Sequence, residues 1–179
     1  GGTPTFSNHA GGVGGAVTLT AGGNISGGPI DTSGGDGDGY AGGNAGGIGV
    51  TSTAGSVTLG TLTAVGGAGY YSAPGNGGAV SVQAAGSIGV GFIDAHGGTV
   101  GTDGGYPVFD GAHGGSVQLT ASGTGTAIQA AGVNATGGFG VDGGNGGNIT
   151  ISALNGGIDL TALIVSDGGT AGDGYFGIF

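Results

Sequence analysis

Carboxylates and imidazoles are the side chains of this 179-residue chain that could carry chemistry. Asp31 and Asp94 each follow an isoleucine at equivalent places of two repeats, and Thr63 holds that place in the repeat between them. In stacked strands two such carboxylates would lie about 9–10 Å apart, at the long end of the separation used in inverting glycoside hydrolysis. No lysine or arginine is available to activate a base, and no nucleophile-elbow motif supports a Ser-His-Asp triad. We therefore predict that the chain is not an enzyme.

The histidines give no metal-binding signature. His9, His96 and His113 include no HExxH motif or other closely spaced pair. His9 and His113 each precede a Gly-Gly pair, which suggests that they hold related positions. We expect all three to be structural or exposed.

The aspartates are the candidate metal ligands, because Ca²⁺ prefers carboxylate oxygens. Residues 34–40 (GGDGDGY) depart from the calcium turn of nonapeptide repeats at the sixth position, which is Gly39, and are not repeated in tandem. Six aspartates lie in Gly-rich tails and could still collect Ca²⁺ between neighbouring repeats or chains; the alternative is that each accepts local N–H bonds in an Asx turn. These six are Asp36, Asp38, Asp103, Asp110, Asp142 and Asp173. No other cofactor is expected.

The charge balance excludes several kinds of partner. Ten aspartates are opposed by no lysine or arginine, so the formal net charge is −10. A chain without cationic side chains cannot neutralise phosphates, which predicts no nucleic-acid binding and no attraction to an anionic membrane. No apolar run approaches the ~18 residues of a membrane-spanning helix, so we predict no membrane insertion. The absence of cysteine excludes thiol catalysis and zinc–thiolate sites.

A cassette of alternating segments followed by a Gly-Gly tail recurs five times. Glycine supplies 55 residues, but not at every third position, and there are only four prolines, which excludes a collagen helix. The landmark residues Val17, Val50, Val80, Val117 and Ile149 are 33, 30, 37 and 32 residues apart, a period typical of stacked repeats. We predict one β-solenoid domain over residues 1–179, with residues 1–15 as the tail of a preceding repeat or an N-terminal docking segment. The repeats are 16–47, 48–78, 79–115, 116–147 and 148–179.

Period-two alternation within each cassette predicts short strands with one buried face. Three such segments per cassette, joined by short Gly turns, fit an all-β fold: a parallel β-helix of about five coils with three short strands per coil. Coils stacked about 4.8 Å apart place equivalent residues in vertical ladders. One predicted interior ladder is Ile30, Leu62, Ile93, Val133 and Ile164; small residues beside it are Thr32, Ala64, Ala95, Ala135 and Ser166; the landmark residues form another.

The Gly-rich tails do not alternate and are predicted to be excursion loops stacked on one side of the coils, where glycine permits close backbone approach and positive φ. Ten of the eleven aromatic residues lie in tails or terminal segments, and we predict that they form a satellite core. They are Phe6, Tyr40, Tyr70, Tyr71, Tyr106, Phe109, Phe139, Tyr175, Phe176 and Phe179.

Strings such as GGAVTLTAGGNIS, GPIDTSGG, GGSVQLTASG and GGNITISALNGGIDLTALIVSDGG resemble the β-helical repeats of filamentous-haemagglutinin-like bacterial exoproteins. The resemblance covers most of the chain. It implies right-handed β-helical fibres, secretion to the cell surface, and adhesive or matrix roles. The long Gly-Gly tails and the absence of basic residues depart from the usual pattern of that family.

These features favour a structural subunit or segment of an extracellular filament, located outside the cell or on its surface and assembling head to tail with itself. The chain begins as a cassette tail would begin and stops within another, and the predicted assembly interface is Phe6, Tyr175, Phe176, Ile178 and Phe179. The main alternative is an adhesin or carbohydrate-binding module for surface glycans, with a groove lined by aromatics and aspartates. A polysaccharide-degrading enzyme or an ice-binding protein ranks lower, because the outward row predicted as Thr18, Thr51, Ser81, Gln118 and Thr150 is not a continuous threonine ladder.

Overall fold

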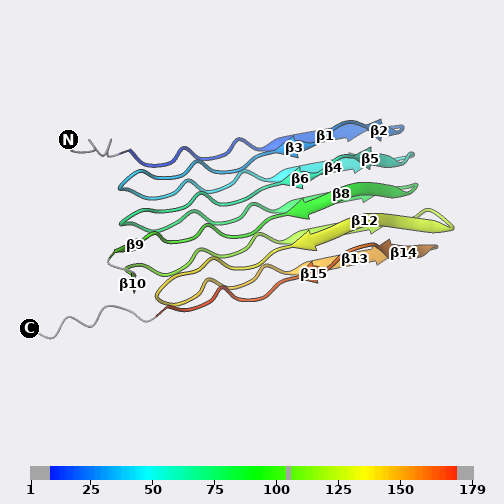
Figure 1. Cartoon of the computed structure of the whole chain (residues 1–179). Helices are drawn as coiled ribbons and strands as arrows, with labels where there is room; N and C mark the ends of the chain where they lie inside the picture. Colours follow the sequence, from blue (N-terminus) through cyan, green and yellow to red (C-terminus); the bar gives the residue numbers. More distant parts are fainter. Residues whose placement is uncertain (1–8, 104–105, 173–179) are drawn as a thin grey trace, which may run out of the picture.

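The computed structural model describes residues 9–103 and 106–172, and within them the chain is all-β. Parallel strands stack as a β-solenoid of about four turns, close to the five coils predicted. In Figure 1 the parallel strands lie on one side of the stack and the wavy Gly-rich segments on the other. That part of the chain has no helix with the length and apolarity needed to cross a bilayer.

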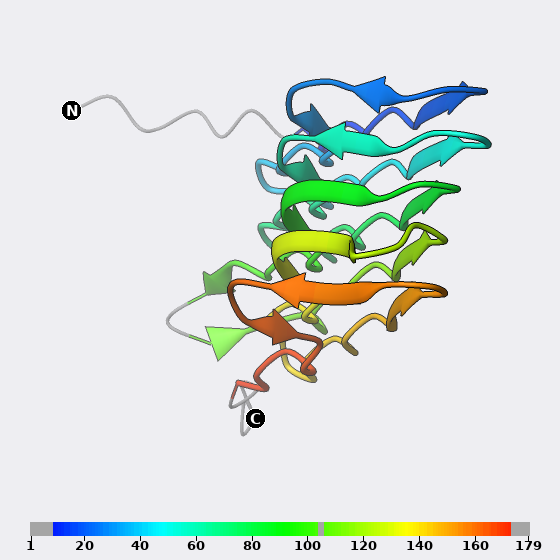
Figure 2. The ribbon, with the colours of Figure 1, turned by 90° about the vertical axis from the view of Figure 1, so that its right-hand side faces the viewer.

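The strands form two parallel sheets that enclose the core between them (Figure 2). One sheet contains the first strand of each coil: β1 (Val17–Ala21), β4 (Ile48–Ser52), β7 (Val80–Ala84), β11 (Val117–Ala121) and β13 (Ile149–Ala153). The other contains β2 (Ile25–Ser26), β3 (Ile30–Asp31), β5 (Val57–Leu59), β6 (Leu62–Thr63), β8 (Ile88–Asp94), β12 (Thr126–Asn134), β14 (Gly157–Leu160) and β15 (Ile164–Val165). A separate antiparallel pair joins β9 (Thr102–Asp103) to β10 (Tyr106–Pro107).

The prediction of three strands per coil holds in only some coils. The second and third segments belong to one sheet, and in two coils they run together as the single strands β8 and β12. These continuous strands carry extra apolar residues between the two segments, whereas Gly27-Gly28-Pro29 interrupts the corresponding stretch of the first coil.

One predicted ladder is confirmed and the other needs a correction. Ile30, Leu62, Ile93, Val133 and Ile164 are successive neighbours across the coils, as expected. The neighbour of Val17, however, is Ile48, and Val50 lies beside Leu19 and Val82. A shift of two residues leaves every side chain on the same face, so alternation alone does not fix the register. For the same reason Thr51 lies beside Thr20 and Gln83, outside the row of Thr18.

The core is complete only where a coil has neighbours on both sides. Leu62, Ile93 and Val133 have no exposed surface, and small residues next to them, such as Ala95, are equally buried. Ile30 at one end of the ladder is half-buried and Ile164 at the other end is 40% exposed. Each coil therefore depends on the adjacent coils for burial of its apolar face.

The Gly-rich tails are hydrogen-bonded parts of each coil and have a period of three. Gly34 and Gly37 donate their N–H groups to the carbonyls of Val65 and Ala68 in the next coil, at 2.9 and 2.8 Å. Gly35, between them, donates instead to Gly12 in the segment across the tail. Along the tail, one N–H group points toward the next coil, the following one points across the tail, and the third points outward. This repeat of three matches the three residues per turn of a polyproline II helix. The excursion loops predicted from sequence are correctly placed on one side, but they are ordered layers.

Glycine fills most of the inner positions of these layers because there is little room for a side chain. Ala112, which holds the place of Gly43 and Gly75 one coil further on, is a buried exception, and its N–H bond to Gly98 is longer, at 3.4 Å. A Cβ on Gly43 would overlap the carbonyl oxygen of Gly12, and one on Gly75 would overlap that of Gly43. Positive φ is not the reason: among described glycines only Gly39 and Gly125 adopt it. Close approach alone explains the composition, much as only glycine fits the crowded axis of collagen.

Outward N–H groups of the tails are satisfied by a ladder of side chains. The backbone N–H of Asn76 donates to Asn44 Oδ1 at 2.8 Å, that of His113 donates to Asn76 Oδ1 at 2.9 Å, and that of Asn145 donates to His113 Nδ1 at 3.0 Å. Each side chain therefore caps the amide of the next coil, which a polar residue at every coil can do. His113 belongs to this ladder, whereas His9 pairs with Asp38 and Gly39, so the two histidines are not equivalent.

The predicted aromatic satellite core is wrong for four of the five tail rings whose side chains the structure describes, whereas the fifth, Phe139, is half-buried. Tyr40, Tyr70, Tyr71 and Phe109 are each 40–48% exposed, and Tyr70 and Tyr71 contact each other edge to face. The glycine layers pack backbone against backbone, so rings are confined to the tips of the tails. Phe6 and residues 175–179 lie outside the described residues, as does the side chain of Tyr106.

Replacing Gly75 by alanine tests the packing of the glycine layers. We expect Gly75→Ala to lower the free energy of unfolding by about 2 kcal/mol, because the backbone at Gly43 must shift to admit the added Cβ. The matched control is Gly12→Ala, at the equivalent position of the first tail, where nothing lies within 4 Å of an added Cβ; its effect should stay within about 0.5 kcal/mol. Urea unfolding of dilute protein measures both, and equal effects would contradict the packing account.

Candidate functional site: the polar row and the end rungs

Two of the tail aspartates accept backbone N–H groups from the next coil. Asp36 Oδ1 accepts the N–H of Ala68 at 2.7 Å, and Asp110 Oδ1 accepts that of Asp142 at 3.2 Å. Asp38 lies at the tip of its tail, where its backbone pairs with His9. Asp110 and Asp142 are thus brought together on adjacent coils, and Asp36 and Asp38 lie in a different tail.

The remaining predicted calcium ligands are less defined. Asp103 lies in β9, and its side chain and the whole of Asp173 lie outside the described residues. Among described residues no group of three or more His, Cys, Asp or Glu side chains is arranged to hold a metal ion. A calcium site made by tail aspartates of one chain alone is therefore not assembled in the described part of the structure.

A polar row crosses the coils on the outer face, where the strands meet the tails. Asp31, Thr63, Asp94 and Asn134 are neighbours on successive coils, as the sequence predicted for the first three. Asp94 Oδ1 accepts a bond from Asn134 Nδ2 at 3.0 Å and lies 2.7 Å from Nδ1 of His96. Sequence reasoning missed His96, although its spacing of two from Asp94 puts both side chains on one face of an extended segment.

Two ionisable groups of this row have shifted pKa values. The hydrogen bond to Asp94 raises the pKa of His96, the neighbouring negative charge adds to that, and partial burial opposes it. Hydrogen bonds from the hydroxyl and the backbone N–H of Ser33 lower the pKa of Asp31. The row can thus present a protonated imidazole beside a carboxylate. Asp31 and Asp94 are two coils apart with Thr63 between them, and the Asp31 Oδ1 and Asp94 Oδ1 atoms are engaged by neighbours.

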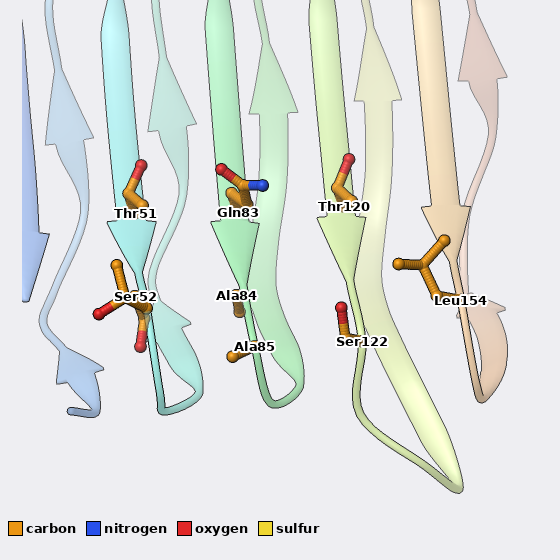
Figure 3. Close-up of a pocket in the computed structure, with 9 residues that line it drawn as sticks. Thr51, Ser52, Gln83, Ala84, Ala85, Thr120, Ser122 and Leu154 are labelled. Atoms are coloured by element: carbon orange, nitrogen blue, oxygen red, sulfur yellow. The ribbon is translucent and has the colours of Figure 1, made fainter. Parts of the chain in front are cut away.

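A shallow groove of about 300 Å³ crosses the outer face of the first sheet (Figure 3). Its walls come from three adjacent coils and offer hydroxyl and amide groups, and Leu154 closes one end. Neither an aromatic ring nor an aspartate is among its lining residues, which are Thr51, Ser52, Thr53, Gln83, Ala84, Ala85, Thr120, Ser122 and Leu154. The groove therefore lacks the groups that the adhesin hypothesis predicted.

The last described rung exposes an apolar surface that is fully buried elsewhere in the stack. Ile158 in β14 is 45% exposed, whereas its neighbour in the ladder, Ile128, is completely buried. Ile164 in β15 is 40% exposed, against 0% for Val133 beside it. The outer edge of β13 pairs with no described strand. This rung therefore exposes apolar side chains of ladders that are buried in the middle coils.

The predicted interface residues are not among those that form this surface in the described part of the chain. Phe6, Tyr175, Phe176, Ile178 and Phe179 lie outside the described residues. Of the exposed residues of the rung, Ile164 belongs to a ladder predicted from the sequence, whereas the ladder of Ile158 was not predicted. The position of both residues in the last repeat was the available signal.

Comparison with family models, with curated proteins and with solved structures yields no match. The resemblance to filamentous-haemagglutinin-like repeats thus extends only as far as the parallel β-solenoid.

The contact between Asp94 and His96 should make stability depend on pH. Because the pKa of His96 is raised by folding, its contribution is complete below the ordinary histidine pKa and is lost as pH rises through the raised value. We expect Asp94→Asn to lower the His96 pKa and to cost more stability at pH 5 than at pH 9, by less than about 1 kcal/mol because both groups are partly exposed.

Titration of the His96 ring by NMR and urea unfolding at both pH values measure these effects. The control is Asp31→Asn, whose partner Ser33 does not titrate and whose own lowered pKa lies below this range. An unchanged His96 titration in Asp94→Asn would contradict the assignment.

Proposed function

We propose that the chain is a structural segment of an extracellular filament, in which solenoid rungs of successive copies stack end to end. The observation that carries the proposal is the half-exposed apolar rung formed by β13, β14 and β15. Its side chains are of the same types as those buried in the middle coils, and a further rung would bury them in the same way.

The charge distribution supports stacking at the ends over association at the sides. All described aspartates are at least partly exposed on outward positions, and no lysine or arginine can pair with them across a lateral contact. Lateral association would bring like charges together, whereas the interior ladders that meet at the ends are uncharged. The polymer grows along the solenoid axis and stays one molecule wide.

The extracellular location rests on the composition and on the sequence resemblance. A chain without lysine or arginine offers trypsin-like proteases no cleavage site, and its stability needs no disulfide because each coil is bonded to its neighbours. The right-handed fibres and surface roles implied by filamentous-haemagglutinin-like repeats fit this assignment.

Electron microscopy of negatively stained protein tests the proposal. We expect wild-type filaments with the width of one solenoid, and we expect Ile158→Asp to abolish them, because a charge would enter the apolar contact. The matched control is Leu163→Asp, in the same rung but outside the interior ladders and 72% exposed. Circular dichroism checks that both variants fold.

Dispersed wild-type monomers at high concentration would contradict the proposal. Equal loss of filaments in both variants would contradict the assignment of the contact to the interior ladder. A parallel sample with chelator separates assembly through the rungs, which persists, from assembly through Ca²⁺ at the tail aspartates, which is lost.

A further inference from the structure

We infer that residues 10–16 of a second copy complete the glycine layer of the first copy, which fixes the register of the end-to-end contact. This inference rests on the proposed function and specifies its interface. The occupant is a second copy of this chain, since the contact repeats the one that each coil makes with the next.

Glycines of the first described rung have open space where the equivalent glycines of later rungs meet the preceding tail. A Cβ on Gly43 or Gly46 would overlap the carbonyl oxygen of Gly12 or Gly15 in the preceding tail. Gly12 and Gly15 themselves have nothing within 4 Å of an added Cβ. Later coils need glycine at these two positions because the preceding tail packs against them. Gly12 and Gly15 are also glycine, although no described segment packs against them.

The strand side of the same rung repeats this pattern. A Cβ on Gly55 would overlap the backbone at Gly23, and one on Gly60 would approach the backbone at Gly28. Gly23 and Gly28 have nothing within 4 Å. Glycines with free space around an added Cβ therefore lie in both the tail and the strand half of the first rung. They lie on its outer face, which points away from the other coils.

The other end of the stack presents the matching half of the tail. Each coil has an outgoing segment after its third strand and a returning segment before the next coil. Gly43 of a returning segment donates to Gly35 of its outgoing segment, and Gly144 donates likewise to Gly138. The outgoing segment of the last coil contains Gly169, which donates to Gly144. In the returning segment 10–16 the carbonyl of Gly12 accepts the N–H of Gly35, but the N–H of Gly12, unlike those of Gly43 and Gly144, has no outgoing carbonyl as its acceptor among the described residues.

When the last coil of one copy stacks on the first coil of a second copy, the backbone hydrogen bonds that join adjacent coils continue across the contact, which we call the seam. Gly114 donates to the carbonyl of Asn145, so Gly146 is positioned to donate to Val13 of the second copy. Val117 donates to Asn148, so Ile149 is positioned to donate to Ala16 of the second copy. The ladder of side-chain caps continues as well, with Asn145 Oδ1 accepting the N–H of Val13.

Charges and apolar groups are compatible in this register. The ladders bring Ile158 to Ile25 and Ile164 to Ile30 of the second copy, following the neighbours within the chain. Asp159 follows Gln129 in its row and would face Ser26. In these rows no aspartate of one copy meets an aspartate of the other.

A disulfide across the seam tests the register, because the chain has no cysteine of its own. Neighbouring backbones about 4.8 Å apart lie within disulfide reach. We expect Val13→Cys/Asn145→Cys to give a series of covalent multimers on oxidation, seen on a non-reducing gel. Asn44→Cys/Asn76→Cys is the geometric control, since the same pair of ladder positions lies within one chain and should close without multimers.

Gly12→Ala provides a second test in the Val13→Cys/Asn145→Cys background. Its Cβ has open space in the single chain but would overlap the Gly144 carbonyl of the other copy, as Gly43 would overlap that of Gly12. We expect at least a tenfold loss of covalent multimers with an unchanged urea midpoint. Unchanged multimers would overturn the inference.

The outcomes separate this inference from the proposed function. Wild-type filaments without disulfides between positions 13 and 145 overturn the register and leave the filament proposal standing. Covalent multimers without filaments support the register and contradict the filament proposal. Protein that stays monomeric on oxidation, while the Asn44→Cys/Asn76→Cys control closes its disulfide, overturns the register.

Discussion

The spacing of about 4.8 Å between hydrogen-bonded backbones governs the whole of this structure. In the strand half of each coil that spacing separates residues whose side chains point in or out, so valine, isoleucine and leucine can fill an interior. In the tail half the backbone is packed against neighbours above, below and across. Most side chains of the tails lie at the outward position of each three-residue turn, and the inner positions are mostly glycine, with Ala112 as a buried exception. The high glycine content follows directly from this difference.

The same constraint explains how a chain with a net charge of −10 and no cationic residue can stack so closely. The described aspartates occupy outward positions, and several of them accept backbone N–H bonds from the next coil or from a nearby turn. Asparagine and His113 do the same in the tails. Polar side chains therefore serve as part of the backbone hydrogen-bond system, and the stack needs no ion pair between acidic and basic side chains. A stack built from nearest-neighbour contacts is least complete at its ends.

The sequence predicted the strand half well because alternation and β-branched residues report burial directly. The ladder through Ile30, Leu62 and Ile93 shows this. It did not fix the register of Val50, because a shift of two preserves the face on which each side chain lies. The register is set by the preceding glycine tail, and the period of three in stretches such as 11–16 was the signal that reading the tails as loops overlooked. The error with the aromatic residues has the same origin, since layers packed backbone to backbone leave no interior for Tyr40 or Tyr70. For the candidate site, the row of Asp31 and Asp94 could be predicted from the repeat, whereas the pairing of His96 with Asp94 requires the geometry of the turn into the tail.

Residue-resolved hydrogen exchange of the tail amides tests the central claim most directly. If the tails are hydrogen-bonded layers, we expect Gly34, Gly35 and Gly37 to exchange as slowly as Ile48 and Val80 of the strands, because each of these amides donates to a neighbouring segment. The amide of Asp36, at the outward position of the same turn, should exchange at least tenfold faster. Slow exchange repeating with a period of three along the tails agrees with the account. Fast exchange at all tail positions, with protection confined to the strands, would contradict it.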